Sequence, residues 1–100
     1  MSVSVRLIAT KTADSSVLGT IAATATVTFG AISLVALETI QLEQKDSSGG
    51  YSPVWFLAPD GSSKRAQLDT RMSLLRVVGP LDYRLVKTKT VNSVEIVEYM

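Results

Sequence analysis

The side chains that most often perform catalysis are either missing from this sequence or dispersed along it. The chain has no His and no Cys, so it lacks the commonest general base and any thiolate nucleophile. Glu95 and Glu98 lie an odd number of positions apart in a predicted strand, so they project from opposite faces and do not form an acid–base dyad. Asp60 and Asp69 are expected to accept hydrogen bonds from backbone N–H groups at turns and strand ends. The sequence therefore predicts no catalytic residue.

Loops of the kinds that bind a metal ion or a phosphate group give no stronger signal. An oxygen-ligand metal site needs several acidic residues in one loop, and Asp46 is accompanied only by Ser47 and Ser48. Gly49 and Gly50 precede strand-like residues and not a helix N-terminus, which indicates a hairpin turn. We therefore predict no metal site, no cofactor-binding residue and no bound cofactor.

Basic and aromatic side chains in the second half of the chain define a nucleic-acid-binding alternative. The basic residues are Lys64, Arg65, Arg76, Arg84, Lys87 and Lys89, and the aromatic ones are Tyr51, Trp55 and Tyr83. Acidic residues are interleaved among them, and the 10 basic and 9 acidic residues give a net charge of only +1. Dispersed charges of this kind usually solvate sheet faces, so nucleic acid is not the favoured partner.

Size and composition predict one domain spanning residues 1–100. Hydrophobic residues make up 46% of the chain, which is enough to form a core. No charge occurs between Asp14 and Glu38, but this stretch is rich in Ser and Thr and alternates apolar with hydroxyl residues from Ala23 to Phe29. That alternation is typical of a strand, so we predict neither a membrane span nor a cleaved signal peptide.

The elements that must position any functional residue are strands. Val3, Val5 and Leu7 alternate with polar residues, as do the apolar residues of 23–29, and Ile40 and Leu42 are expected to face inward. Gly and Pro separate these runs, and no segment shows a helical period. The pattern predicts an all-β fold, a small antiparallel β-sandwich of about seven to eight short strands, either Ig-like or jelly-roll-like.

Three residues in the second half refine this prediction. Pro53 donates no backbone hydrogen bond, so its strand, 51–57, should lie at a sheet edge or carry a bulge. Trp55 is expected in the core, with the neighbouring Phe56 directed to the opposite face. Tyr83 is expected to pack inside while its hydroxyl reaches a loop backbone, as in a tyrosine corner.

The order of features from Thr39 onwards resembles that of small structural proteins of tailed bacteriophage virions. The features are a strand at 40–45, a Ser-Gly-Gly hairpin, an aromatic strand at 51–56, an Asp-Gly turn, and the run Gly79-Pro80-Leu81-Asp82-Tyr83-Arg84-Leu85-Val86-Lys87. The resemblance is to the capsid decoration, or cement, and head-fibre-base kinds. The chain departs from their pattern at Leu81 and Asp82, where such proteins often carry glycine, and its hairpin loop is longer. These departures leave the family within this group open.

The resemblance implies a non-enzymatic virion structural protein that binds and stabilises a capsid, or forms part of a head fibre or tail. Its partners would be the major capsid protein or other virion proteins, commonly with the chain as a homo-oligomer. It would reside in the virion, and in the host cytoplasm during assembly. The alternative is a stand-alone carbohydrate-binding or adhesin-type sandwich, which would need several exposed aromatic side chains on one face. A nucleic-acid-binding small barrel is the third option.

Two apolar segments are the candidate partner interface. The first strand offers Val3, Val5 and Leu7 at a possible free sheet edge. The second segment, 31–37, is apolar where a polar turn is expected. It is either a further buried strand or helical turn, or an exposed contact patch. Its candidate contact residues are Ile32, Leu34 and Val35.

Overall fold

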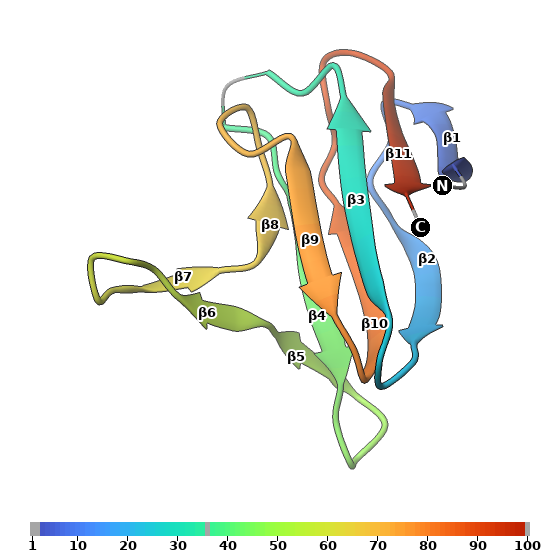
Figure 1. Cartoon of the computed structure of the whole chain (residues 1–100). Coiled ribbons are helices and arrows are strands. Elements are labelled where there is room, and N and C mark those ends of the chain that lie inside the picture. The colour runs from blue at the N-terminus through green and yellow to red at the C-terminus, as the bar shows by residue number, and fades with distance from the viewer. Residues whose placement is uncertain (1–2, 36, 100) are drawn as a thin grey trace.

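The computed structural model describes residues 3–35 and 37–99 of the chain. Within these residues eleven strands and no helix are present, and most of the strands form two antiparallel sheets that pack face to face (Figure 1). The predicted all-β sandwich is thus confirmed. The strands are more numerous than expected because the segment 51–68 is divided into four short ones. None of the described residues forms a helix able to cross a membrane.

The two sheets are built from strands that alternate along the chain. The four-stranded sheet contains, in spatial order, β1 (Val3–Thr10), β11 (Val94–Tyr99), β3 (Thr26–Ile32) and β9 (Leu74–Val78). The five-stranded sheet contains, in order, β2 (Asp14–Ile21), β10 (Leu81–Lys87), β4 (Ile40–Lys45) and β5 (Tyr51–Pro53), with β8 (Gln67–Leu68) also paired to β4. A separate hairpin consists of β6 (Trp55–Leu57) and β7 (Ser63–Arg65).

The pairing follows the pattern of one long hairpin wrapped around the core. β1 pairs with β11, β2 with β10, β3 with β9, and β4 with β5, all antiparallel. Successive strands β1 to β4 therefore alternate between the two sheets. This nested pairing is that of a jelly roll, whereas an Ig-like sandwich keeps its first two strands in one sheet. Of the two forms left open by the sequence, the jelly roll is the one observed.

The core is formed by the inward-facing residues of both sheets. Ile40, Leu42 and Leu85 of the five-stranded sheet are completely buried, as the alternation at 40–43 predicted. Phe29 of β3 meets the Tyr83 ring edge-on, with ring centroids 5.1 Å apart and planes at 64°. Each large apolar side chain buried in this way contributes about 1.5–3 kcal/mol, which holds the two sheets together in the absence of a disulfide.

The first strand departs from the alternation that the sequence indicated. Val3 and Val5 lie opposite Tyr99 and Val97, but the register shifts before Leu7. Leu7 consequently turns to the inner side, where it packs against the core. The expectation that these three residues share one face was wrong, because an irregularity in the pairing with β11 reverses the side-chain direction.

The strand predicted to begin at Ala23 begins instead at Thr26. The preceding residues form a turn in which the N–H of Ala25 donates to the carbonyl of Ala22 over 3.0 Å. The alternation from Val27 to Phe29 continues into the sheet as predicted, with both side chains buried. Hydroxyl–apolar alternation therefore located the strand but not its start.

The edge of the five-stranded sheet is interrupted by an insertion. The N–H of Val54 donates to the carbonyl of Leu42, the N–H of Ala66 donates to the carbonyl of Val54, and the N–H of Leu42 donates to the carbonyl of Ala66. β5 and β8 are thus two halves of one edge strand, which confirms the edge position predicted from Pro53. Residues 55–65, here called the arm, leave the sheet between these halves and project from the sandwich (Figure 1).

Candidate protein-binding surface

The outer face of the four-stranded sheet is rich in apolar side chains. Cross-strand pairing aligns Val5, Val97, Gly30 and Leu74 in one row across all four strands. Gly30 has no side chain, and the Val97, Leu74 and Tyr99 side chains come within 3.2 Å of the position that its Cβ would occupy. These three side chains fill the space beside Gly30 that a side chain would otherwise occupy. The result is a continuous apolar strip on a face that no other element of the described chain covers.

The structure places the six sequence-predicted interface residues in three environments. Val3, Val5 and Ile32 lie on the outer face of the four-stranded sheet, with 61%, 55% and 55% of their surfaces exposed. Leu7 and Leu34 pack against the core. Val35 is half-buried, and its N–H donates to Glu38 Oε1 over 2.9 Å. The first three are brought together on one surface and the other three are directed elsewhere; their role in binding a partner stays a prediction.

The arm carries the largest apolar side chains that remain exposed. Trp55 is 60% exposed and Leu57 is 75% exposed, and Phe56 lies between them. In the hairpin these three residues pair with Arg65, Ser63 and Lys64 respectively. The prediction that Trp55 enters the core was wrong, because its strand pairs outside the sandwich. A two-stranded ribbon is only marginally stable by itself in water, so this apolar arm is suited to being covered by a partner.

Ion pairs attach the base of the arm to the sandwich. Arg65 Nη2 lies 3.2 Å from Glu43 Oε2, and Arg84 Nε lies 2.6 Å from Glu43 Oε1. The Arg84 guanidinium also lies over the Tyr51 ring, 4.4 Å from its centroid. One carboxylate on β4 thereby holds a residue of the arm and a residue of β10, which fixes the direction in which the arm leaves the sheet.

The same contacts bear on the nucleic-acid alternative. Tyr83 is buried in the core and Tyr51 is covered by Arg84. Trp55 is exposed on the arm, so the three aromatic residues do not form a common stacking surface. Arg65 and Arg84 are both occupied by Glu43. The basic and aromatic residues singled out in the sequence are therefore not assembled into one site.

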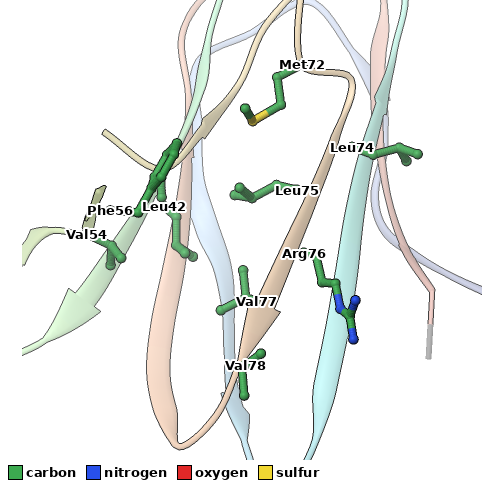
Figure 2. Close-up of a pocket in the computed structure, with 10 residues that line it drawn as sticks. Leu42, Val54, Phe56, Met72, Leu74, Leu75, Arg76, Val77 and Val78 are labelled. Atoms are coloured by element: carbon green, nitrogen blue, oxygen red, sulfur yellow. The ribbon is translucent and has the colours of Figure 1, made fainter. Parts of the chain in front are cut away.

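A groove of about 450 Å³ runs between β9 and the base of the arm. Its apolar lining comes from both sides (Figure 2). The lining residues are Leu42, Val54, Phe56, Ala66, Met72, Leu74, Leu75, Arg76, Val77 and Val78. Neither the groove nor the arm was predicted from the sequence. The available signal was the run Trp55-Phe56-Leu57, because a strand at a sheet edge has no room to bury three consecutive large side chains.

A polar cluster lies between the sheets on the side opposite the groove. The buried Glu98 carboxylate accepts a hydrogen bond from the Tyr83 hydroxyl over 3.3 Å and lies 3.4 Å from Arg6 Nη1. Arg6 also donates to the carbonyl of Leu18. The Tyr83 hydroxyl therefore bonds a carboxylate and not a loop backbone, which corrects the tyrosine-corner expectation. A Cβ at Gly19 would lie 2.5 Å from that hydroxyl, so only glycine leaves room for the ring.

This environment makes the stability of the fold sensitive to high pH. Burial raises the pKa of Tyr83 from 10.0 to about 12; Glu98 adds to the rise and Arg6 opposes it. Because the unfolded chain releases this proton first, the contribution of Tyr83 is complete below pH 10 and is lost as the pH rises toward 12. We expect Tyr83→Phe to remove up to about 2 kcal/mol of this pH dependence. Urea unfolding of both proteins across this range measures the difference, and parallel curves would contradict the prediction.

A second polar cluster surrounds a buried lysine. Lys87 is 1% exposed, and its Nζ donates to the carbonyls of Thr12 and Thr88 over 2.7 and 3.2 Å. Burial lowers the pKa of Lys87, while the nearby Glu38 and Asp14 carboxylates oppose this shift. The hydrogen-bond partners of the ammonium group are carbonyl oxygens, so the lysine is not positioned to activate a hydroxyl nucleophile. The cluster supports the fold.

Comparison of the chain with models of protein families, with curated proteins and with solved structures finds no match. The exposed apolar surface is therefore the observation on which a functional proposal is based.

Proposed function

We propose that this chain is a non-enzymatic structural protein of a virion, which docks onto the major capsid protein or another virion protein and reinforces it. The observation that carries the proposal is the arm, an apolar ribbon held away from the sandwich by the Glu43 ion pairs. Exposing large apolar side chains such as Trp55 and Leu57 to water is unfavourable, so their exposure marks a site that a partner covers. Binding another protein is the use that this geometry supports best.

The energetics of the arm favour a specific contact. Burying a large apolar side chain contributes about 1.5–3 kcal/mol, and Trp is among the residues that dominate measured interface energies. The outer face of the four-stranded sheet, with Val3, Val5 and Ile32, adds a second apolar surface. Several copies bound to one lattice would multiply a weak single contact through avidity, so a homo-oligomer or a repeated array fits the proposal.

The fold is compatible with two of the roles considered. Jelly rolls occur in viral capsid proteins and in lectins, and a fold does not by itself assign a function. The carbohydrate-binding alternative is favoured by one observation, the exposed Trp55. Sugar binding through stacking needs a flat aromatic platform, and here Trp55 and Phe56 project from opposite sides of a two-stranded ribbon. Docking onto another virion protein would bury both of these side chains, so the virion role is preferred.

Particle composition tests the proposal directly. Virions purified from the source of the chain should contain it at a fixed ratio to the capsid subunit, as measured by quantitative mass spectrometry. Particles that lack the chain should bind the purified protein in a saturable manner. Virions without the chain would overturn the assignment, and binding to a glycan array in place of particles would favour the carbohydrate alternative.

The arm itself is tested by a double substitution. Trp55→Ser with Leu57→Ser should weaken binding to particles about a hundredfold, because two side chains of the hot-spot type are lost. Leu18→Ser is the matched control, since Leu18 is exposed on β2 away from the arm, and it should change binding less than about twofold. Unchanged circular dichroism would show that both variants are folded. Equal binding by the arm variant and the control would exclude the arm as the docking element.

A further inference from the structure

The four-stranded sheet ends at β9 with an edge that no strand of the described chain pairs with. The N–H of Ala31 donates to the carbonyl of Ser73, and the N–H of Gly79 donates to the carbonyl of Ala25. In an antiparallel ladder alternate residues direct their backbone groups to the same neighbour. Residues 73, 75, 77 and 79 therefore bond to β3. The N–H and C=O groups of Leu74, Arg76 and Val78 point the other way, to the open edge.

The groove lies alongside this edge, and its lining includes Leu75 and Val77 from the inner side of the sheet as well as the edge residues Leu74, Arg76 and Val78. Figure 2 shows Leu75 and Val77 directed from β9 toward the space beside Phe56 and Met72, while Arg76 is directed to the opposite side of the strand. A strand placed next to β9 would present every second side chain to this space. The groove thus matches the inner face of one added strand.

The surroundings of the groove determine which kind of molecule fits. The arm projects from the side of the sandwich that contains the groove (Figure 1). A second whole sandwich that extended the sheet at β9 would meet the arm, whereas a single extended segment would pass between the arm and β9. A segment of a partner protein is therefore favoured over another copy of this chain.

The charges beside the groove favour an acidic residue in that segment. Arg76, Lys64 and Arg71 lie beside it and are largely exposed. None of the three forms an ion pair with a carboxylate in the part of the chain that the structure describes. Two carboxylates lie nearby: Asp60 is close to Lys64, and Asp69 is close to Arg71. The Asp69 carboxylate also accepts the backbone N–H groups of Arg71 and Met72. Three basic and two acidic side chains leave a net positive charge beside the groove, and Arg76 forms no ion pair among the described residues, so its guanidinium is available to a ligand.

We propose that β9 accepts an extended segment of a partner protein as a fifth strand of the four-stranded sheet. The segment carries apolar residues that enter the groove opposite Leu75 and Val77, and an acidic residue opposite Arg76. Backbone hydrogen bonds to Leu74, Arg76 and Val78 provide affinity for the extended backbone, and the alternating side chains provide specificity. This inference deepens the proposed function, because it specifies the form in which a partner is bound, and it is tested separately from particle binding.

A blocked peptide of sequence Ser-Thr-Val-Glu-Val-Thr-Ser tests the inference. When it is added to the full chain, amide exchange measured by NMR should slow more than about tenfold at Leu74, Arg76 and Val78. The amides of Leu75 and Val77 should change little, because they already bond to β3. Exchange that is unchanged at the first three amides with millimolar peptide would overturn the proposal.

Modified peptides provide the matched controls. N-methylation of the Glu and of the Thr that follows the second Val removes N–H groups that would face β9, and should abolish binding. N-methylation of the two Val residues alters N–H groups that would face away, and should leave binding largely intact. Equal effects of the two modifications would exclude strand addition.

The proposed pairing between Arg76 and the acidic residue of the peptide is tested by reversing the charge on each side. Arg76→Glu should weaken binding of the Glu peptide about fivefold, and a peptide with Lys in place of Glu should recover it. Failure of the peptide experiments with the chain still present on virions would reject strand addition alone. Strand addition in a chain absent from virions would reject the virion role alone.

Discussion

Replacing Gly79 by alanine is expected to lower the free energy of unfolding by more than about 3 kcal/mol, the largest loss expected from adding a single methyl group to this chain. A Cβ at this position would lie 2.0 Å from the carbonyl oxygen of Ala22 and 2.8 Å from that of Ile21. These atoms belong to the backbone, so no side-chain rotation relieves the contact. The clash would separate the β9–β10 connection from the β2–β3 connection, which lie against each other at one end of the sandwich.

The effect of Gly79→Ala is expected to extend beyond the turn itself, because the N–H of Gly79 also donates to the carbonyl of Ala25 over 3.0 Å. Moving the backbone away from Ala22 would weaken this bond and the adjacent end of the β3–β9 ladder. Since the proposed fifth strand is added to β9, any folded fraction of the variant should also bind the Ser-Thr-Val-Glu-Val-Thr-Ser peptide more weakly. Chemical unfolding followed by tryptophan fluorescence and circular dichroism measures the loss of stability.

Gly61→Ala is the matched control for this substitution. Gly61 has a φ of +87°, and a Cβ there would meet nothing within 4 Å. Its replacement should cost only about 1 kcal/mol, from the conformational preference of alanine. A similar loss in the two variants would contradict the prediction, because it would show that a small backbone shift relieves the contact between the new Cβ and the Ala22 carbonyl.

The parts of the fold that depend on local patterning were predictable from the sequence. Alternation at Ile40 and Leu42 assigned two completely buried residues, and Pro53 correctly indicated a sheet edge. Both signals arise within a few residues, from side-chain direction and from a missing backbone donor. The sequence also indicated a sandwich, but the choice between Ig-like and jelly-roll pairing depends on contacts between distant strands. That choice therefore required the structure.

The sequence-based predictions that were wrong, and the features that were missed, all depend on pairing between strands that are distant in the sequence. Leu7 turns inward because the register between β1 and β11 shifts, and the sequence of β1 alone contains no sign of this shift. Trp55 lies outside the core because its strand pairs with Ser63–Arg65 and not with the sandwich. Of the predicted interface, Val3, Val5 and Ile32 lie on one exposed face because each follows the period of its own strand. The arm and the groove were missed because both result from an insertion that divides an edge strand.

Replacing Glu38 by alanine is expected to cost about 3 kcal/mol, although Glu38 is remote from the arm. Its Oε1 accepts the N–H of Val35 over 2.9 Å and its Oε2 accepts the N–H of Val91 over 2.7 Å. The carboxylate thereby joins the loop after β3 to the turn before β11, and it provides negative charge near the buried Lys87. Alanine would leave two backbone donors without an acceptor and would leave Asp14 as the remaining nearby carboxylate for the Lys87 ammonium group. Urea unfolding at neutral pH measures the loss.

Two further variants separate these contributions. Glu38→Gln retains one oxygen acceptor and removes the charge, so it should cost about half as much as alanine. Lys87→Met combined with Glu38→Ala should be less destabilised than the sum of the two single variants by about 1 kcal/mol, because neither charge is then buried alone. Strict additivity would show that Glu38 acts only as a hydrogen-bond acceptor for the two loops. A positive coupling would instead show that one carboxylate both connects the loops and allows a lysine to be buried between the sheets.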